Sequence, residues 1–420
     1  MKKTVNSHSA AFNMFKQSAN ALERWEQGNN LNRILREHPS RSLLANLLYN
    51  LFRHRAVIDW IIDQHLNYGV EQKLRNILRI ALTDILYLQG AAPEVITDVA
   101  VRYTKNCCSN KKSRFINAVL RNILREGAES CQEQALRHGD PAVRLELSTE
   151  LYQQWKRRNS EELESLSKLL ATPAPLIVRA VNRRKRSWTD VPPFLQPLPA
   201  PEWAKHEQFF RCTDPHAMFT SEIFHNGELY LQDPATLLAV NLLIPSPGET
   251  IADLCCAPGG KAVCIAEKMA GEGTLLCLDR SFERLKMTEP HIADFPNTCL
   301  GVARVEQPPL PPASLDAILL DVPCSNTGVI RRRPDIRWHF SRANLANLIT
   351  IQQQMLATAV TLIKPGGRIV YSTCSIEEEE NRLQIQRFVK EHSEIQKVED
   401  KALLPASSHD GAYAALLTRL

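Results

Sequence analysis

The sequence predicts an α/β fold with a mostly parallel, doubly wound sheet, preceded by an all-helical domain. Helical periodicity fills the first third of the chain, where strand signals are almost absent. From about residue 226, short apolar strands alternate with helices, as in a parallel sheet covered on both faces. The composition is globular, with 44% hydrophobic and 23% charged residues among 420. We expect a helical domain at 1–135, an intermediate domain or linker at 136–225, and an α/β domain at 226–420.

The helical domain is predicted from three amphipathic segments, Leu43–Ile62, Lys73–Leu88 and Arg114–Arg125. In the second segment, apolar residues recur three or four positions apart, which places them on one helix face. They are Leu74, Ile77, Leu78, Ala81, Ile85 and Leu88. We expect the three helices to bury these faces against one another in a bundle.

Basic residues are concentrated in the same third. Residues 1–135 hold 19 Lys and Arg against 12 Asp and Glu, a balance of +7, so the rest of a chain with net charge +5 sums to −2. This asymmetry suggests a polyanionic partner, with a solvated basic face as the alternative. The basic stretch Lys105–Arg114 is predicted as a loop feeding a helix N-terminus, which suits a phosphate, although a plain solvated loop explains it equally well.

The middle of the chain is mixed. We expect a helix around Ser148–Leu170 and then a proline-rich stretch, Thr172–Pro201. Within that stretch, the basic run Arg183–Arg186 is either a solvated surface or part of a path for RNA, and the residues alone leave both interpretations open.

The α/β domain begins with a glycine-containing motif, Asp253 to Lys261, between a predicted strand and a predicted helix. Four strands are expected at Thr250–Leu254, Thr274–Asp279, Leu315–Asp321 and Arg368–Ser372, and helices at Lys261–Met269 and Ala343–Ile363. Glycines in such a turn let backbone N–H groups approach a ligand closely. Asp279 ends the next strand, where an acid hydrogen-bonds ribose hydroxyls in nucleotide-binding sheets.

No G-x-G-x-x-G fingerprint is present, which favours an adenosine cofactor other than a dinucleotide, with a plain tight turn as the structural alternative. The candidate cofactor-binding residues are Cys255, Cys256, Ala257, Pro258, Gly259, Gly260, Lys261, Asp279 and Asp321.

Two cysteines follow two further strands. Asp321 and Cys324 stand at the carboxyl end of one strand, the edge at which ligands bind in open α/β sheets, and Cys374 follows another. Ser375 and Glu378 have the S-x-x-E form of a capping box, which predicts that Cys374 precedes a helix N-terminus, where the dipole lowers a thiol pKa. Either cysteine alone would be interpreted as a structural thiol, but the two together favour catalytic thiols.

The eleven cysteines indicate a reducing compartment. Their number is odd and no C-x-x-C pair occurs, so neither a disulfide framework nor a metal site is expected. The polar start lacks the apolar segment of a signal peptide, and no apolar run reaches the roughly 20 residues that span a bilayer. We expect a cytoplasmic protein without metal or membrane contact.

Taken together, the motifs resemble RNA cytosine-5 methyltransferases that use S-adenosyl-L-methionine. That family carries C-A-A-P-G-G-K, D-A-P-C and T-C-S motifs in this order, and here Cys256 and Val322 each replace an alanine. The stretch Gly328–Trp338 is similar to the family's loop after D-A-P-C. The helical third resembles NusB-type RNA-binding domains, most clearly at Phe115–Arg121. This domain order is that of bacterial 16S ribosomal RNA methyltransferases, and the resemblance covers nearly the whole chain.

The resemblance implies a Rossmann-like methyltransferase domain that methylates C5 of a cytosine in 16S ribosomal RNA. A thiolate that adds to C6 makes C5 nucleophilic, and an acid at N3 stabilises the charge that develops on the ring. By resemblance, Cys374 is the nucleophile, Cys324 assists product release, and Asp321 contacts N3 or the cofactor. The rival assignment exchanges the cysteines, because DNA cytosine methyltransferases use the cysteine of a Pro-Cys motif.

One departure from the family concerns the cofactor adenine. Val302 stands where the family has an acid, and Glu306 is the candidate substitute. The sequence leaves three alternative functions: the same chemistry on transfer RNA, a non-catalytic RNA-binding assembly factor, and a small-molecule methyltransferase. The NusB-like domain favours ribosomal RNA, the cysteine pair favours catalysis, and the basic first third disfavours a small substrate. We expect a monomer that acts on 16S RNA, free or in an assembling small subunit.

Overall fold

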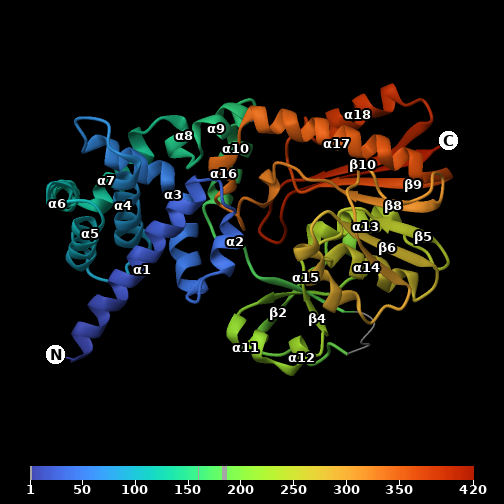
Figure 1. The fold of residues 1–420 in the computed structure, drawn as a ribbon, viewed down its shortest axis with the longest axis horizontal. Coiled ribbons are helices and arrows are strands. Elements are labelled where there is room, and N and C mark those ends of the chain that lie inside the picture. Colours follow the sequence, from blue (N-terminus) through green and yellow to red (C-terminus); the bar gives the residue numbers. More distant parts are fainter. Residues whose placement is uncertain (1, 159, 182–186) are drawn as a thin grey trace. The chain divides into compact units, whose positions relative to one another are not determined.

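The computed structural model describes residues 2–158, 160–181 and 187–420, so the predicted basic run Arg183–Arg186 lies outside the described residues. The chain divides into two compact units (Figure 1). The helical unit consists of Met1–Thr172 together with Arg333–Phe340, and the α/β unit of Pro173–Arg332 together with Ser341–Leu420. Among the described residues, no helix is both long and apolar enough to cross a membrane. The predicted boundaries at residues 135 and 225 stay a prediction.

The helices of the helical unit bury apolar residues, and those that lie between residues 15 and 135 meet in one core. These helices are α1 (Lys2–Glu26), α2 (Leu31–Arg36), α3 (Arg41–Gln64), α4 (Gln72–Thr83), α5 (Pro93–Cys107), α6 (Asn110–Glu126), α7 (Ala128–His138), α8 (Pro141–Arg144), α9 (Thr149–Trp155), α10 (Ser160–Leu170) and α16 (Ile336–His339). The predicted helix Lys73–Leu88 is α4 continued by a π-helical turn at Asp84–Leu88. Its predicted apolar face is buried at Leu74, Ile77 and Leu78.

Two details of the helical prediction were wrong. The stretch Lys105–Arg114 is not a loop, because α5 runs to Cys107 and α6 already begins at Asn110. Ser109 caps α6 by accepting a hydrogen bond from the Lys112 backbone N–H. The predicted helix Ser148–Leu170 is divided into α9 and α10.

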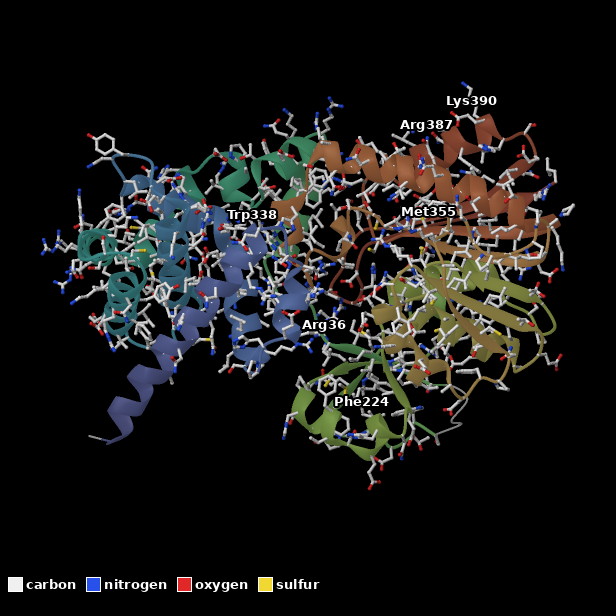
Figure 2. All side chains as sticks on the ribbon, viewed as in Figure 1. Arg36, Phe224, Trp338, Met355, Arg387 and Lys390 are labelled. Atoms are coloured by element: carbon white, nitrogen blue, oxygen red, sulfur yellow. The ribbon has the colours of Figure 1, made fainter. Side chains whose placement is uncertain are left out.

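A short segment from late in the sequence completes the helical unit. Arg337 in α16 is fully buried and donates to the backbone carbonyls of Arg53, Glu146 and Leu170 at 2.7–3.0 Å. Trp338, labelled in Figure 2, donates its indole N–H to the Phe52 carbonyl at 2.8 Å. Buried backbone carbonyls are normally satisfied by hydrogen-bond donors such as these.

The α/β unit is built around a seven-stranded sheet with the order β10-β11-β9-β8-β5-β6-β7. The strands are β5 (Thr250–Asp253), β6 (Thr274–Asp279), β7 (Thr298–Val302), β8 (Leu315–Asp321), β9 (Ile363–Thr373), β10 (Ile395–Leu403) and β11 (Ala412–Arg419). Strands β5 to β9 are parallel, and β11 lies antiparallel between β9 and β10. The predicted strands at Thr274–Asp279 and Leu315–Asp321 are confirmed at both ends, whereas β7, β10 and β11 were missed.

Alternate residues of each strand face opposite layers of helices. One face packs on α17 (Arg342–Leu362) and α18 (Arg382–Glu391), and the other on α13 (Leu237–Leu243), α14 (Gly260–Met269) and α15 (Phe282–Ile292). In β8, Ile318 faces the α17 layer, while Leu319 faces the α13–α14 layer. Figure 2 labels Met355, which α17 buries against the sheet. Both faces being covered explains the continuous apolar runs of the sequence.

A smaller antiparallel sheet precedes the large one, with the order β2-β3-β1-β4. Its strands are β1 (Ile177–Ala180), β2 (Leu195–Leu198), β3 (Phe209–Cys212) and β4 (Leu229–Leu231), with short helices α11 (Pro215–Thr220) and α12 (Glu222–His225) between the last two. Fully buried Arg179 in β1 pairs with Glu207 and with Glu267 of α14, at 3.1 and 2.9 Å. The pair with Glu267 joins the small sheet to helix α14, which packs on the large sheet.

Candidate active site

Strand order reverses at β5, whose neighbours are β6 and β8, so a crevice is expected beyond the carboxyl ends of β5 and β8. The predicted cofactor loop lies there: β5 ends at Asp253, and α14 begins at Gly260. Gly259 has a φ of 102°, and a Cβ at this position would lie 2.7 Å from Cγ2 of Thr288. The loop therefore requires glycine at residue 259.

Asp253 is a buried carboxyl group at the end of β5. The side chain is 1% exposed, and neither carboxylate oxygen has a hydrogen-bond partner among the described residues. Burial, followed by the charge of Asp321, raises its pKa to about 7, against the opposing charge of Lys261. A buried acceptor without a donor is costly, so this position suits a cationic ligand group that would satisfy it.

Asp279, the predicted ribose contact, is already engaged by groups of its own unit. Its carboxylate accepts from the backbone N–H groups of Ala257 and Ser281 at 3.3 and 2.9 Å. Arg284 of α15 pairs with the same carboxylate at 3.1 Å and also donates to the Ala257 carbonyl. The side chain closes the β6 end of the crevice, and its contact with a ribose stays a prediction.

Lys261, Asp321 and Ser372 form one polar network beneath the crevice. The Lys261 ammonium pairs with Asp321 and donates to the Ser372 hydroxyl at 3.3 Å, while that hydroxyl donates to Asp321 at 2.6 Å. Burial alone would lower the Lys261 pKa, but the charge and hydrogen bond of Asp321, and then the charges of Cys374 and Asp253, outweigh it and raise the pKa. Lys261 therefore stays cationic next to the candidate nucleophile.

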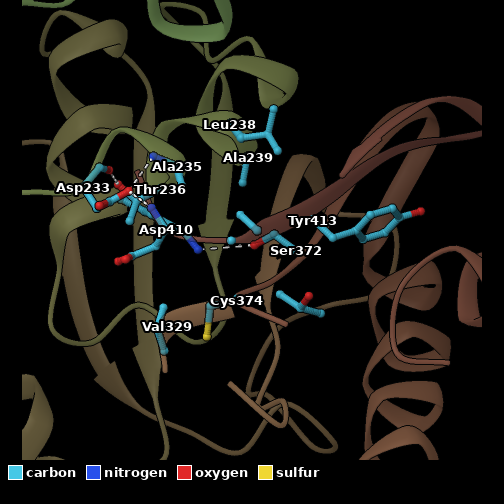
Figure 3. A pocket seen from close by; sticks show the side chains of 14 residues that line it. Asp233, Ala235, Thr236, Leu238, Ala239, Val329, Ser372, Cys374, Asp410 and Tyr413 are labelled. Carbon is cyan, nitrogen blue, oxygen red and sulfur yellow. Dashed lines mark hydrogen bonds between the residues drawn. The ribbon is translucent and has the colours of Figure 1, made fainter. Parts of the chain in front are cut away.

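The two predicted cysteines are brought into contact, with their sulfur atoms 3.4 Å apart. Cys324 is buried, and its hydrogen bond with Cys374, then burial, raises its pKa well above the usual value. Cys374 is half-buried and lines a small cavity that Figure 3 shows from close by. Of the two thiols, Cys374 is the one that opens onto this cavity together with Lys261 and Ser372.

The loops that carry the two cysteines are joined by several contacts. Asn326 has a left-handed backbone (φ 61°), donates to the Cys324 carbonyl at 2.7 Å, and accepts from the Cys374 thiol at 3.0 Å. The Gly328 N–H donates to the Cys374 carbonyl at 3.0 Å. A Cβ on Gly328 would lie 2.6 Å from the Gly411 carbonyl oxygen, so the loops approach closely only because this residue is glycine.

The predicted capping box after Cys374 was wrong. The Ser375 hydroxyl accepts from the Glu377 N–H at 3.0 Å, while Glu378 is exposed. Helix α18 begins only at Arg382, so its N-terminus does not directly follow Cys374. A helix dipole at α18 therefore does not act directly on the Cys374 thiol, whose sulfur contacts Cys324.

An acidic pair forms another wall of the cavity, and sequence reasoning missed it. Arg332 bridges Asp233 and Asp410, at 2.6 and 2.5 Å (Figure 3 shows the two acids). Burial, then the charge of Asp233, raises the Asp410 pKa to about 6. Both acids lie outside the recognisable motifs, so no sequence signal pointed to them.

In the helical unit, a hollow between α5 and α6 is lined by charges of both signs, with Glu94 and Asp98 on the α5 side. Arg114 and Arg121 line it together with Asn117 and Ser113, and both arginines are exposed. Lys112, by contrast, pairs with Glu71 at 2.7 Å. The phosphate contact predicted for Lys105–Arg114, at the start of α6, stays a prediction.

Comparison with known proteins bears on both units. The family model for the 16S rRNA methyltransferase RsmB/F matches residues 240–416, and the NusB family model matches residues 6–125. Ribosomal RNA small subunit methyltransferase B of Vibrio cholerae is 33% identical over 90% of this chain and 89% of its own length. The chain belongs to the 16S rRNA methyltransferase RsmB/F family. The probable methyltransferase B of Bacillus subtilis is 30% identical, over 85% of this chain and 81% of its own.

Solved structures share the fold of this family member. The crystal structure of PH0851 superposes with a TM-score of 0.77 over 97% of this chain and 99% of that chain, at 21% identity. A methyltransferase homologue from Pyrococcus horikoshii superposes with a TM-score of 0.56 over 67% of this chain and 98% of that chain, at 25% identity. The predicted family, the NusB-like domain and the Rossmann-like sheet are confirmed.

Methyltransferases of this family use S-adenosyl-L-methionine, and the crevice fits that cofactor. The unpartnered carboxylate of Asp253 would meet a cationic group of the ligand, and the glycine turn at Gly259 leaves backbone N–H groups accessible. Val302, where the family has an acid, is 56% exposed at the end of β7, and Glu306 is also exposed.

Proposed function

We propose that this ribosomal RNA methyltransferase methylates C5 of a cytosine in 16S ribosomal RNA through a covalent bond between Cys374 and C6 of the base. The observation that carries the proposal is the contact of two cysteine sulfurs, 3.4 Å apart, beside the cofactor crevice. A methyltransferase acting on a nitrogen or a hydroxyl needs no thiol pair, whereas cytosine C5 is a poor nucleophile that needs activation by an added thiolate.

Cys374 is the better candidate for the nucleophile. Because its hydrogen bond with Cys374 and its burial both favour the thiol form, Cys324 stays a thiol and can donate a hydrogen bond to a Cys374 thiolate. The Lys261 ammonium adds a favourable charge near that thiolate. Cys374 also lines the cavity, where a base could reach it.

The remaining groups have roles that follow from their chemistry. Addition of the Cys374 thiolate to C6 forms the S–C6 bond and leaves C5 enamine-like, with negative charge spread toward N3. Asp321, when protonated or bridged by the Lys261 ammonium, stabilises that charge. The bound cofactor supplies an electrophilic methyl group to C5. A base then takes the C5 proton, and the S–C6 bond breaks, which releases the methylated RNA from Cys374. We assign Cys324 to this release step.

The helical unit would hold the RNA. Its basic residues, including Arg114 and Arg121, offer phosphate contacts that position a substrate without reading its sequence. The target cytosine must leave any base stack to reach Cys374, so we propose a looped or unstacked site in the RNA. A 16S RNA substrate implies a cytoplasmic enzyme, and we propose that it acts as a monomer.

Bisulfite sequencing of ribosomal RNA from cells with and without this protein tests the substrate. We expect one cytosine of 16S RNA to lose its protection from bisulfite when the protein is absent. An unchanged map of 16S RNA would overturn the ribosomal assignment, and a change confined to transfer RNA would redirect it.

Two cysteine variants test the chemistry. Cys374→Ala should abolish methyl transfer and form no covalent complex, whereas Cys324→Ala should accumulate a protein–RNA adduct that survives denaturing electrophoresis. Cys299→Ala, at an exposed position of β7, is the control and should behave as the parent. Recovery of the adduct from the Cys374 variant instead would exchange the two assignments.

A further inference from the structure

The acidic run Glu377–Glu380 follows Cys374, and two of its residues, Glu377 and Glu380, are buried. Glu380 is fully buried, and its carboxylate accepts hydrogen bonds from three donor groups. The Ser325 backbone N–H lies 2.9 Å from Oε1, the Ser325 hydroxyl 2.5 Å from Oε2, and Nε2 of Gln352 2.9 Å from Oε1. Burying a carboxylate is costly unless donors satisfy it, so these bonds hold Glu380 in one position.

Ser325 follows Cys324 directly, so the Glu380 carboxylate fixes the loop that carries Cys324. Gln352 of α17 adds to this, because the same Nε2 donates to the Pro323 carbonyl at 3.0 Å. The residues on both sides of Cys324 are therefore tied to one buried cluster. The cluster is anchored to the sheet, since the hydroxyl of Tyr371 in β9 donates to the Glu380 carbonyl at 2.7 Å.

The next residue, Asn381, makes the equivalent contacts around Cys374. Asn381 is 4% exposed; its Oδ1 accepts from the Thr373 hydroxyl at 2.6 Å, and its Nδ2 donates to the Ser375 carbonyl at 2.9 Å. Thr373 and Ser375 are the two neighbours of Cys374. The backbone on both sides of this thiol is thus held by one amide.

We propose that Glu380 and Asn381 are positioning residues that together set the separation of the two active-site sulfurs, Glu380 by holding the Cys324 loop and Asn381 by holding the Cys374 loop. Because the two are consecutive, their side chains share one rigid peptide, and the two loops cannot move independently. The Ser325 and Ser375 hydroxyls meet at 3.0 Å and close the arrangement between the loops. The roles assigned to the separate sulfurs rest on the proposed function.

The consequences for the reaction differ between the two residues. Glu380→Gln offers one acceptor oxygen in place of two, so one of the Ser325 and Gln352 donors loses its partner and the Cys324 loop loosens. If Cys324 acts in release, this variant should form the RNA adduct at the normal rate and resolve it slowly. Asn381→Ala frees the Cys374 loop instead, so adduct formation should slow. Displacement of a reacting group by 1 Å can cost about 100-fold, so we expect effects of roughly tenfold or more.

A separate measurement reports the sulfur spacing without RNA. In a glutathione redox buffer, glutathione disulfide oxidises the two thiols to a Cys324–Cys374 disulfide and is itself reduced to two glutathione thiols. The equilibrium gives the effective concentration of one thiol toward the other, and peptide mass spectrometry identifies the bond. Either variant should lower this effective concentration by roughly tenfold, in line with the expected loss of positioning.

The experiment compares the full-length parent, Glu380→Gln, Asn381→Ala and the control Glu378→Gln, whose side chain is exposed two positions away. For each we would measure the disulfide equilibrium, the rates of adduct formation and decay, and the melting temperature. If Glu380→Gln does not fold, Ser325→Ala removes only the hydroxyl donor and should change the disulfide equilibrium and adduct decay in the same direction.

The outcomes separate this proposal from the one on function. An unchanged disulfide equilibrium in both variants, or equal slowing of adduct formation and decay that follows only the melting temperature, would overturn the positioning role. A parent that forms no adduct, combined with variants that lower the thiol effective concentration, would retain the positioning role and overturn the proposed covalent chemistry.

Discussion

Replacing Asp253 with asparagine should stabilise the cofactor-free protein at neutral pH and leave its stability near pH 4 nearly unchanged. Burial raises the pKa of this carboxyl from 3.8 to about 7. Between about pH 4 and about pH 7, the folded protein keeps a proton that the unfolded chain has released. Raising the pH through this window therefore lowers the free energy of unfolding of the parent, and the neutral amide removes this dependence.

The structure sets the size of the effect. At about 1.36 kcal/mol per pKa unit, the difference between 3.8 and about 7 corresponds to about 4 kcal/mol above pH 7. This is an upper limit, because relaxation and entry of water reduce the cost of a buried charge. The difference in the free energy of unfolding between variant and parent should rise with pH. It should become constant once the Asp253 carboxyl is ionised in both the folded and the unfolded parent.

Urea unfolding of parent and Asp253→Asn from about pH 5 to about pH 8 measures this difference directly. Calorimetry in two buffers of different ionisation enthalpy supplies a second reading: the parent should release up to one proton when the cationic cofactor binds near pH 6.5, and the variant none. A stability difference that stays constant with pH would mean that Asp253 is ionised in the folded protein, and the interpretation of its burial would be refuted.

Three further outcomes are expected. Arg337→Leu removes three hydrogen bonds to buried backbone carbonyls and should lower the free energy of unfolding of the helical unit by about 3–5 kcal/mol in urea titrations; a loss below about 1 kcal/mol would contradict the importance of these bonds. Gly328→Ala places a Cβ against the Gly411 carbonyl and should lower kcat about tenfold or more while calorimetry shows unchanged cofactor affinity, whereas a matching loss of affinity would refute a local effect. Replacing Arg114 and Arg121 together with glutamine should weaken RNA binding and reduce the dependence of log Kd on log salt by up to about 2, and an unchanged salt dependence would exclude this face.

Sequence patterns predicted the parts of the α/β unit that are buried on both faces. β6 and β8 are continuous apolar runs that end in an aspartate, which marks their ends clearly. β7 was missed because it is an edge strand whose residues Cys299, Leu300 and Val302 are exposed, so it shows neither a buried run nor a clear alternation. Edge strands carry a weaker signal because only part of their surface is packed.

At the site, the sequence motifs identified the reactive side chains but not the contacts that position them. Cys324 and Cys374 were both predicted, yet nothing in a separation of fifty positions indicated that the sulfurs touch. Glu380 stands last in a run of four glutamates, and an acidic run is normally solvated. Its burial depends on donors from Ser325 and Gln352, which lie far away in the sequence, so only the tertiary structure distinguishes it from exposed Glu378.

The segment Arg333–Phe340 affects how this protein can be made. On the ribosome, residues 1–172 emerge well before this segment, but their core is incomplete without the three carbonyl contacts of Arg337. A further 168 residues (340 − 172) must be synthesised first, which takes on the order of 10–30 s at roughly 5–20 residues per second. During that interval the helical unit lacks Arg333–Phe340, while the strands of the catalytic sheet are being translated. A fragment that ends at residue 172 would never acquire the segment Arg333–Phe340. We therefore expect the two units to be expressed and to fold together.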